Sequence, residues 1–276
     1  MRRKKVIYKT LLYVALLSFT LIIAFPFIYM LSGSFKNDVE IVRKPLAIIP
    51  EQPTLNNFVE LFNRMPFMKQ MLNSTLVALT ASILTMFFSS LVAYGYVRFE
   101  FKGKNALFVI MLSTMMVPPQ ALMIPQFKMF QSFGWLNTYY PLIIPFAISA
   151  FGVFLIRSVM VSIPKDIFEN ANIDGCSEFF ICMRIAIPLA KTGIIIQGIL
   201  TFMQVWNDFM TPLIYLTREN LYTLTIGLST LVGFYDVEYG IPMAGALLSA
   251  LPVIIILNIV GQKYFVEGMM AGAVKG

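Results

Sequence analysis

Glu169-Asn170-Ala171-Asn172-Ile173-Asp174-Gly175 is a polar stretch that lies between two apolar runs, each long enough to cross a lipid bilayer. Pro188 follows Gly175 by thirteen residues. Ionised carboxylates are costly inside a bilayer, so this acidic stretch must lie in water beside the membrane. The pattern predicts a bundle of membrane helices that carries one polar helix-turn element outside the lipid.

The composition is that of a membrane protein. Hydrophobic residues make up 58% of the 276 residues and charged residues 13%, whereas soluble domains have roughly 45–50% and about 25%. Lipid cannot satisfy the amides of an open strand, and the apolar runs lack the alternation of barrel strands. We therefore expect an all-α membrane protein with a single transmembrane domain over residues 1–276. Its six spans are expected at about 11–31, 71–97, 106–124, 140–156, 193–216 and 241–260.

The lysines and arginines predict the orientation of these spans. If residues 1–10 and 261–276 lie in the cytoplasm, the inner segments hold fourteen of these cations and the outer segments seven. Membrane proteins show this excess on the cytoplasmic side. We therefore expect both termini, and a loop at about 158–190, to be cytoplasmic. The same bias, with attraction to anionic membrane lipid, accounts for the net charge of +7 without nucleic-acid binding.

The residue types disfavour several other functions. The basic stretch Arg2-Arg3-Lys4-Lys5 precedes the first apolar run. That run exceeds the about 7–15 apolar residues of a signal peptide, so an uncleaved anchor is expected. The chain has no histidine to complete a site with Cys176 and Cys182. Both cysteines fall in the cytoplasmic loop, where thiols stay reduced, so structural thiols are expected rather than a metal or redox site. No G-x-x-x-x-G-K-[ST] loop occurs to bind the phosphates of ATP.

The polar loop is expected to form two short helices at an angle. Asp166 and Glu169 have the spacing of a capping box, which predicts a helix start at Asp166. Gly175 can adopt the left-handed conformation that closes a helix. Ser177-Glu178 can cap a second helix, which Pro188 then separates from the fifth span.

The first of these helices has a small apolar face made by Ile167, Phe168 and Ala171. A short amphipathic helix of this kind suits a groove in a partner protein. The alternative is a solvated connector between two spans, although about 30 residues is long for a passive connector.

The same residues carry a resemblance to a known family. Permease subunits of bacterial ATP-binding cassette importers have a cytoplasmic signature of the form E-A-A-x-x-D-G-A, followed after five residues by F-x-x-I-x-L-P. This chain matches the signature at Glu169, Ala171, Asp174, Gly175, Ile185 and Pro188. It departs from the signature at Asn170, Cys176, Cys182 and Ile187, by exchanges that keep the helix and the turn possible.

The resemblance covers essentially the whole chain and is closest to the carbohydrate branch of these permeases, in particular the six-span subunit of maltose transporters. The motifs that carry it are Asn73-Ser74-Thr75-Leu76, Leu136-Asn137-Thr138-Tyr139, Trp206-Asn207-Asp208-Phe209 and the tail from Glu267 to Gly276. The segment 35–69 resembles the family's external loop. The resemblance implies the fold of a type I ATP-binding cassette importer permease in the bacterial plasma membrane.

The resemblance also implies partners and their contacts. It implies a second homologous permease subunit, two ATPase subunits that bind ATP and magnesium, and an extracellular or periplasmic sugar-binding protein. This chain would hold no cofactor and no catalytic residue. The residues that would couple to the ATPase are Glu169, Ala171, Asp174, Gly175, Arg184 and Pro188. The tail would reach between the ATPase subunits through Gly272, Lys275 and Gly276.

Polar side chains within the spans are candidates for a solute path, because they usually face the bundle interior or water. Gln197, Thr201, Gln204 and Asp208 fall three or four residues apart, on one face of a helix. The full candidate set is Asn73, Gln197, Thr201, Gln204, Asn207 and Asp208. The alternative is helix packing, since the same residue types also bond neighbouring helices.

The leading hypothesis is a permease subunit of an ATP-driven importer of a sugar, with an oligosaccharide favoured. A related solute such as glycerol phosphate is an alternative. An ion-coupled secondary transporter is less favoured, because such proteins carry ionisable residues at mid-membrane and only Asp208 is a candidate. A membrane enzyme would need a cluster of catalytic groups that this sequence does not offer.

Overall fold

The structure is a computed structural model that describes residues 2–231, 238–262 and 264, and its described residues form helices without strands. Within these described ranges, four helices are long and apolar enough to cross a membrane, or six if each of two bent helix pairs is one span. The α-helices are α1 Arg2–Gly33, α2 Asp38–Arg43, α3 Asn56–Arg64, α4 Phe67–Arg98, α5 Lys104–Ser113, α6 Pro119–Ser132, α7 Tyr140–Ile143, α8 Ala150–Met160, α9 Lys165–Ile173, α10 Glu178–Ile181, α11 Ile187–Leu189, α12 Lys191–Trp206, α13 Met210–Tyr215, α14 Leu224–Ser229 and α15 Gly240–Ile256. Short 3₁₀ and π-helical turns join or extend these helices. The 3₁₀ turns are Thr114–Met116, Ile144–Phe146 and Glu219–Leu221, and the π-helical turns are Cys182–Ala186 and Leu257–Gly261.

The chain divides into two compact units. The first unit comprises residues 1–67 and 227–251, and the second comprises residues 68–226 and 252–276. The polar loop and all the described candidate path residues belong to the second unit.

In the first unit, α3 packs closely against the start of α15. A Cβ atom at Gly240 would lie 2.5 Å from Nδ2 of Asn57, so only glycine permits this approach. Asp38 of α2 accepts hydrogen bonds from the backbone N–H groups of Tyr239 and Gly240, at 2.7 and 2.9 Å. These bonds satisfy amides that the first turn of α15 leaves without helical partners.

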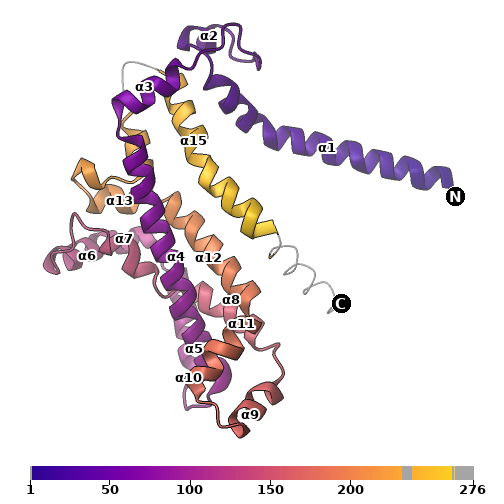
Figure 1. The fold of residues 1–276 in the computed structure, drawn as a ribbon, viewed down its shortest axis with the longest axis vertical. Helices are drawn as coiled ribbons and strands as arrows, with labels where there is room; N and C mark the ends of the chain where they lie inside the picture. The colour runs from indigo at the N-terminus through magenta and orange to yellow at the C-terminus, as the bar shows by residue number, and fades with distance from the viewer. Residues whose placement is uncertain (1, 232–237, 263, 265–276) are drawn as a thin grey trace. The chain divides into compact units, whose positions relative to one another are not determined.

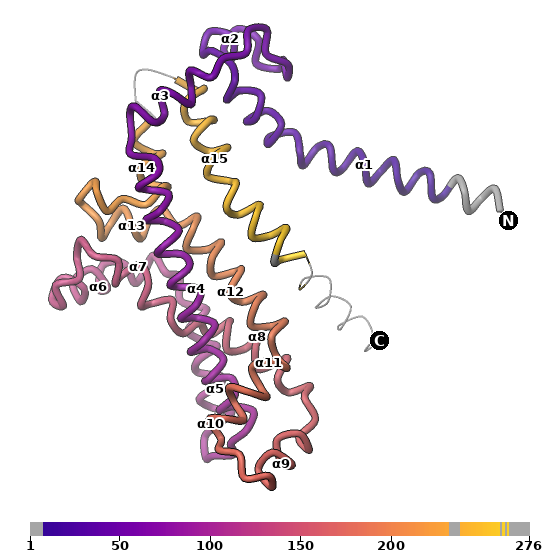
Figure 2. The backbone as a smooth tube through the Cα atoms, viewed as in Figure 1, coloured from indigo at the N-terminus to yellow at the C-terminus, as the bar shows by residue number. Residues whose placement is uncertain are grey.

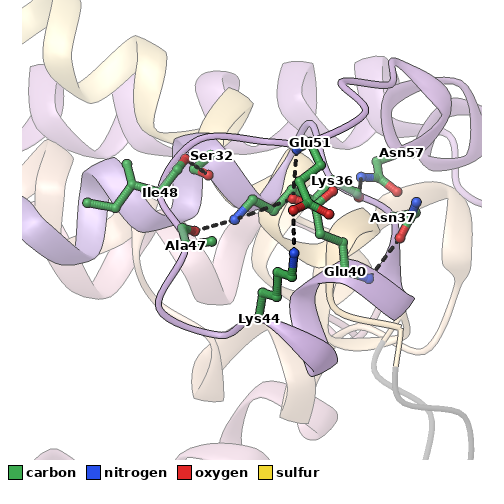
Figure 3. A network of polar contacts seen from close by, with 9 residues as sticks. All are labelled: Ser32, Lys36, Asn37, Glu40, Lys44, Ala47, Ile48, Glu51 and Asn57. Carbon is green, nitrogen blue, oxygen red and sulfur yellow. Dashed lines mark hydrogen bonds and ion pairs between the residues drawn. The ribbon is translucent and has the colours of Figure 1, made fainter.

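A buried polar network organises the segment between α1 and α3 (Figure 3). The side chain of Lys36 is 1% exposed and donates to the carbonyl of Ala47, with the carboxylate of Glu40 at 4.0 Å. Glu40 also accepts from the backbone N–H of Glu51 at 3.0 Å. Asn57 donates to the carbonyls of Ser34 and Lys36, at 3.0 and 2.7 Å. A buried charge is tolerated only when it is paired and hydrogen-bonded, so these contacts fix the path of the segment.

In the second unit, the polar loop is built onto the end of α4 that carries Arg98 (Figure 1). One apolar core joins side chains of α4, α8, α9, α10 and α12, with Ile156, Met160 and Ile181 fully buried. Glycines allow the close packing of α8 and α12, because a Cβ at Gly193 would meet Val159 at 2.8 Å. Small residues at such crossings are typical of membrane helices.

Three of the expected spans are not single straight helices, and one of them, 140–156, contains α7, the 3₁₀ turn Ile144–Phe146 and part of α8. The expected span 106–124 contains a 97° bend between the helical stretches Lys104–Met116 and Pro119–Ser132. Pro118 and Pro119 explain the bend, because proline lacks the N–H that would continue the helix. The expected span 193–216 contains α12, which ends at Trp206, and α13. Asn207 and Asp208 separate these helices, and both side chains bond to local backbone groups.

Candidate functional site

The site is the helix-turn-helix element from α9 to α11, called here the elbow, residues 164–190. The backbone runs from α8 to α9 and returns through α10 and α11 into α12 (Figure 2). The axis bends by 78° between the helical stretches Glu178–Leu189 and Lys191–Trp206, which include α11 and α12.

The first helix of the elbow begins differently from the sequence prediction. α9 starts at Lys165 with Pro164 at the N-cap position, and no side chain caps it. The expected capping box of Asp166 and Glu169 is therefore wrong. The helix starts one residue earlier than predicted because the N–H of Ile167 bonds the carbonyl of Pro164 at 3.2 Å. Asp166 then lies in the first turn, where a carboxylate still interacts favourably with the helix dipole.

The turn and the start of the second helix agree with the sequence prediction. Gly175 has a φ of 80°, the left-handed conformation that L side chains rarely adopt. The hydroxyl of Ser177 accepts from the N–H of Phe180 at 3.3 Å and so caps α10. The predicted angle between two short helices thus has its cause in one glycine and one serine.

The apolar face of α9 is used within this chain. Phe168 and Ala171 are 3% and 7% exposed and belong to the core with α4 and α10. The ring of Phe168 meets the ring of Tyr94 edge to face, with centroids 6.2 Å apart. The expectation that these two side chains fill a partner's groove is therefore wrong, because α4 and α10 already cover them. Ile167, by contrast, is 38% exposed.

The opposite face of α9 is open. Glu169 and Asp174 are exposed, and Ile173 is 82% exposed. Isoleucine at this exposure gains nothing for the isolated chain, because it leaves apolar surface in water. The free face of the elbow, taken here as this side of α9, therefore presents one strongly exposed apolar side chain, Ile173, together with the carboxylates of Glu169 and Asp174.

A charged clamp fixes the elbow to α4. Nε and Nη2 of Arg98 donate to Oε1 of Glu178 at 3.0 and 2.8 Å, and Nε also lies 3.1 Å from Oε2. The hydroxyl of Tyr94 donates to Oε2 at 2.6 Å. Hydrogen bonds to ionised groups are the stronger ones, and a guanidinium with several bonds also fixes orientation. The last turn of α4 and the first residue of α10 are thereby held together.

Sequence reasoning missed this clamp. It singled out Glu178 only as a helix cap and Arg98 only as an inner cation. The sequence does show a carboxylate, that of Glu178, in the first turn of a predicted short helix. Its partner, Arg98, lies 80 residues earlier in the chain. No pattern within one segment identifies such a pair.

The second half of the elbow contains the remaining predicted residues. Cys182 is buried and begins a π-helical turn, whereas Cys176 is partly exposed, and both are free thiols. Arg184 and Pro188 are exposed. The elbow thus presents Glu169, Asp174, Gly175, Arg184 and Pro188 to its surroundings and keeps Ala171 inside.

The candidate path residues fall into two groups. Gln197 and Thr201 are each 3% exposed, and Nε2 of Gln197 donates to the hydroxyl of Thr201 at 3.1 Å. Gln197 packs on Gly152 of α8, where a Cβ would lie 2.9 Å from its amide carbon. Gln204 of the same helix is exposed. This face of α12 is therefore covered by α8 at Gln197 and open at Gln204.

The other candidates bond to nearby backbone groups. Asn73 donates to the carbonyls of Asn220 and Tyr222, at 3.2 and 2.9 Å. Asn207 donates to the carbonyl of Met203 at 2.8 Å, and Asp208 accepts from the N–H of Thr211 at 3.2 Å. The tail residues Gly272, Lys275 and Gly276 lie outside the described residues.

Comparison with known proteins identifies the class. Residues 85–265 match the family described as binding-protein-dependent transport system inner membrane component. The arabinooligosaccharides transport system permease protein AraQ of Bacillus subtilis is 37% identical over 98% of this chain and 97% of its own. The trehalose/maltose transport system permease protein MalG of Thermococcus litoralis is 31% identical over 99% of both chains.

A solved structure shares the fold. A chain of a bacterial ABC transporter involved in the import of the acidic polysaccharide alginate is 24% identical, with a TM-score of 0.83 over 95% of this chain and 98% of that chain. This likeness confirms the predicted all-α type I importer permease fold. The chain belongs to the family of inner-membrane permease components of binding-protein-dependent ATP-binding cassette transport systems.

Proposed function

We propose that this chain is one of two permease subunits of an ATP-driven importer of an oligosaccharide. Relatives that align over nearly their whole length include permeases for arabinooligosaccharides and for trehalose and maltose. The family match and the four to six candidate spans among the described residues support a multi-pass protein of the plasma membrane. The excess of lysine and arginine supports cytoplasmic termini and a cytoplasmic elbow.

The proposed assembly adds a second homologous permease subunit and two ATPase subunits. ATP and magnesium bind to the ATPase subunits, where hydrolysis takes place. The free face of the elbow, with Ile173 between Glu169 and Asp174, docks on an ATPase subunit. The observation that carries this proposal is the combination of that open face with the clamp between Glu178 and Arg98.

The clamp gives the docked elbow a mechanical role. When the ATPase subunits close, they displace α9, and the shared core and the clamp pass this displacement to α4. Rigid-body motion of packed elements is a common way to switch between two states. Alternating exposure of the solute path to the two sides of the membrane follows from motion of the spans. Ala171 acts from inside, by fixing α9 to the core.

The segment between α1 and α3 offers a second contact in this proposal. The segment between α1 and α3 is held in one conformation by the buried Lys36, Glu40 and Asn57 (Figure 3). A prefolded segment costs little entropy when a partner binds. We assign it to contact with an extracellular or periplasmic sugar-binding protein. A chain from a transporter solved with such a periplasmic protein has a related fold, with a TM-score of 0.66.

Uptake by the reconstituted complex tests the proposal. The full complex is placed in lipid vesicles, with the binding protein and a radiolabelled arabinan or maltodextrin oligosaccharide outside. We expect uptake that requires ATP inside and persists when ion gradients are dissipated. Uptake driven by a proton or sodium gradient without ATP would contradict the proposal. Failure of every oligosaccharide, with ATP-driven uptake of glycerol phosphate, would overturn the substrate class alone.

A further inference from the structure

A basic pocket lies between α4, α8 and α9, at the foot of the elbow. Its volume is about 300 Å³. Its charged lining consists of Arg98, Lys104, Arg157, Lys165, Glu100 and Glu169. Four cations against two carboxylates leave the lining with an excess positive charge of two.

Two of the cations are already paired. Arg98 holds Glu178, and Lys104 lies 2.8 Å from a carboxylate oxygen of Glu100. Arg157 and Lys165 form neither an ion pair nor a hydrogen bond through their side chains with any described residue. The pocket therefore has two cations available for an anion.

The unsatisfied guanidinium of Arg157 is the main indication that the pocket binds an anion. Its guanidinium lies 4.5 Å from the ring centroid of Phe108, which stabilises the cation but accepts no hydrogen bond in the plane of the group. Its Nε atom is buried and has no hydrogen-bond partner among the described residues. Buried donors are nearly always satisfied, so an unpaired one that lines a cavity calls for an acceptor inside that cavity.

The field in the pocket favours an anion. The hydrogen bond from Lys104, its charge and the charge of Lys165 lower the pKa of Glu100 below its usual value. Glu169 offsets part of this charge but is itself exposed to solvent.

The position of the pocket, at the ends of two spans, favours a lipid headgroup as the anion. Arg98 ends the span α4, and Arg157 lies in the last turn of α8, the end of another span. Tyr96 lines the pocket, and tyrosine rings concentrate at the headgroup level of a bilayer. Basic pockets between membrane helices on the cytoplasmic side suit lipid headgroups.

We infer that this pocket binds a phosphate group, and that its source is the headgroup of an anionic phospholipid of the inner leaflet. Arg157 and Lys165 donate to the phosphate oxygens, and the acyl chains pass over the exposed Val161 towards the bilayer. The inference does not depend on which solute the permease carries, but it rests on the proposed cytoplasmic position of the elbow.

Native mass spectrometry of the full-length chain in detergent tests the site. The probes are phosphatidylglycerol, phosphatidylcholine and inorganic phosphate. We expect phosphatidylglycerol to bind more tightly than phosphatidylcholine, and each of Arg157→Gln and Lys165→Gln to weaken it about fivefold, the equivalent of about 1 kcal/mol per cation. Lys102→Gln is the matched control, because Lys102 lies in the same loop region but does not line the pocket.

Three results would overturn the inference. Equal weakening by Lys102→Gln would mean that only the general surface charge matters. Displacement of phosphatidylglycerol by inorganic phosphate would make the ligand a free anion rather than a lipid. An acidic segment of an ATPase subunit that crosslinks to position 165 and excludes phosphatidylglycerol would make the pocket a protein contact. If Arg157→Gln does not fold, Lys165→Gln at an exposed position carries the test by itself.

Discussion

Arg98 and Glu178 form a multiply bonded ion pair, with Nη2 2.8 Å from Oε1 and Nε 3.1 Å from Oε2. The pair joins the last residue of α4 to the first residue of α10 across 80 residues of sequence. Tyr94, one turn before Arg98, donates to the same carboxylate. A displacement of the elbow therefore pulls on a membrane span through charged hydrogen bonds as well as through apolar packing.

Glu178→Gln tests the clamp. We expect a loss of about 1–2 kcal/mol in the free energy of unfolding, since charged hydrogen bonds are lost at a site that solvent partly screens. The measurement is thermal unfolding of the chain in detergent. Arg98→Gln combined with Glu178→Gln should cost less than the sum of the two single changes. Glu100→Gln removes an ion pair of similar length whose carboxylate is 85% exposed, so it should change stability far less than Glu178→Gln does. Strict additivity of the two single changes would contradict the clamp.

Gly175→Ala tests the turn of the elbow. A Cβ at this position meets no atom within 4 Å, so only the backbone conformation at φ 80° resists the change. We expect a cost of about 1–2 kcal/mol and a lower ratio of transport to ATP hydrolysis in vesicles. Gly95→Ala, also in open space but inside α4, should be neutral or stabilising. Gly175→Asn should lie close to the parent chain, because asparagine tolerates this conformation. Equal effects of Gly175→Ala and Gly95→Ala would count against the argument.

Asn57→Ala tests the external segment. The change leaves the carbonyls of Ser34 and Lys36 without their amide donor in a buried site. We expect a loss of about 1–3 kcal/mol and faster proteolysis of residues 44–54. The neighbouring Asn56 is exposed, so Asn56→Ala should leave the proteolysis rate unchanged. Indistinguishable rates for the two variants would show that the network does not hold the segment.

Gly152→Ala tests the packing of α8 on α12. The added methyl group would lie 2.9 Å from the amide carbon of Gln197, so it overpacks the crossing. We expect a cost of about 1–3 kcal/mol in the stability of the chain in detergent. Gln197→Ser in the same chain should recover part of that cost by making room. If the second change adds to the loss, Gln197 does not occupy this crossing.

Local features of the elbow could be predicted from sequence because their causes lie within a few residues. Gly175 closes α9 through its own backbone freedom, and Ser177 caps α10 through an amide three residues on. The start of α9 was placed one residue too late, because Pro164 supplies the first carbonyl of the helix before Asp166 is reached.

The contacts between segments could not be predicted in the same way. The clamp pairs Arg98 of α4 with Glu178 of α10. Sequence periodicity describes each helix by itself and does not indicate which residues of two helices meet. The face of α12 that carries Gln197 could be identified from the spacing of its polar residues. The helix that packs on this face could not, because the contact is made at Gly152, and a glycine adds nothing to the apolar pattern of α8. The bend after Met116 had a visible cause in two consecutive prolines, whereas its angle of 97° does not follow from the prolines alone.

Photo-crosslinking from position 173 tests the central claim most directly. Ile173 is 82% exposed on the free face of the elbow, so a photoreactive residue there does not disturb the core. In the assembled complex we expect it to trap an ATPase subunit, with a yield that changes when ATP binds. The same residue at position 72, which is exposed at the opposite end of α4, should trap none. Absence of an ATPase adduct from position 173, or capture of the external binding protein there, would contradict the account.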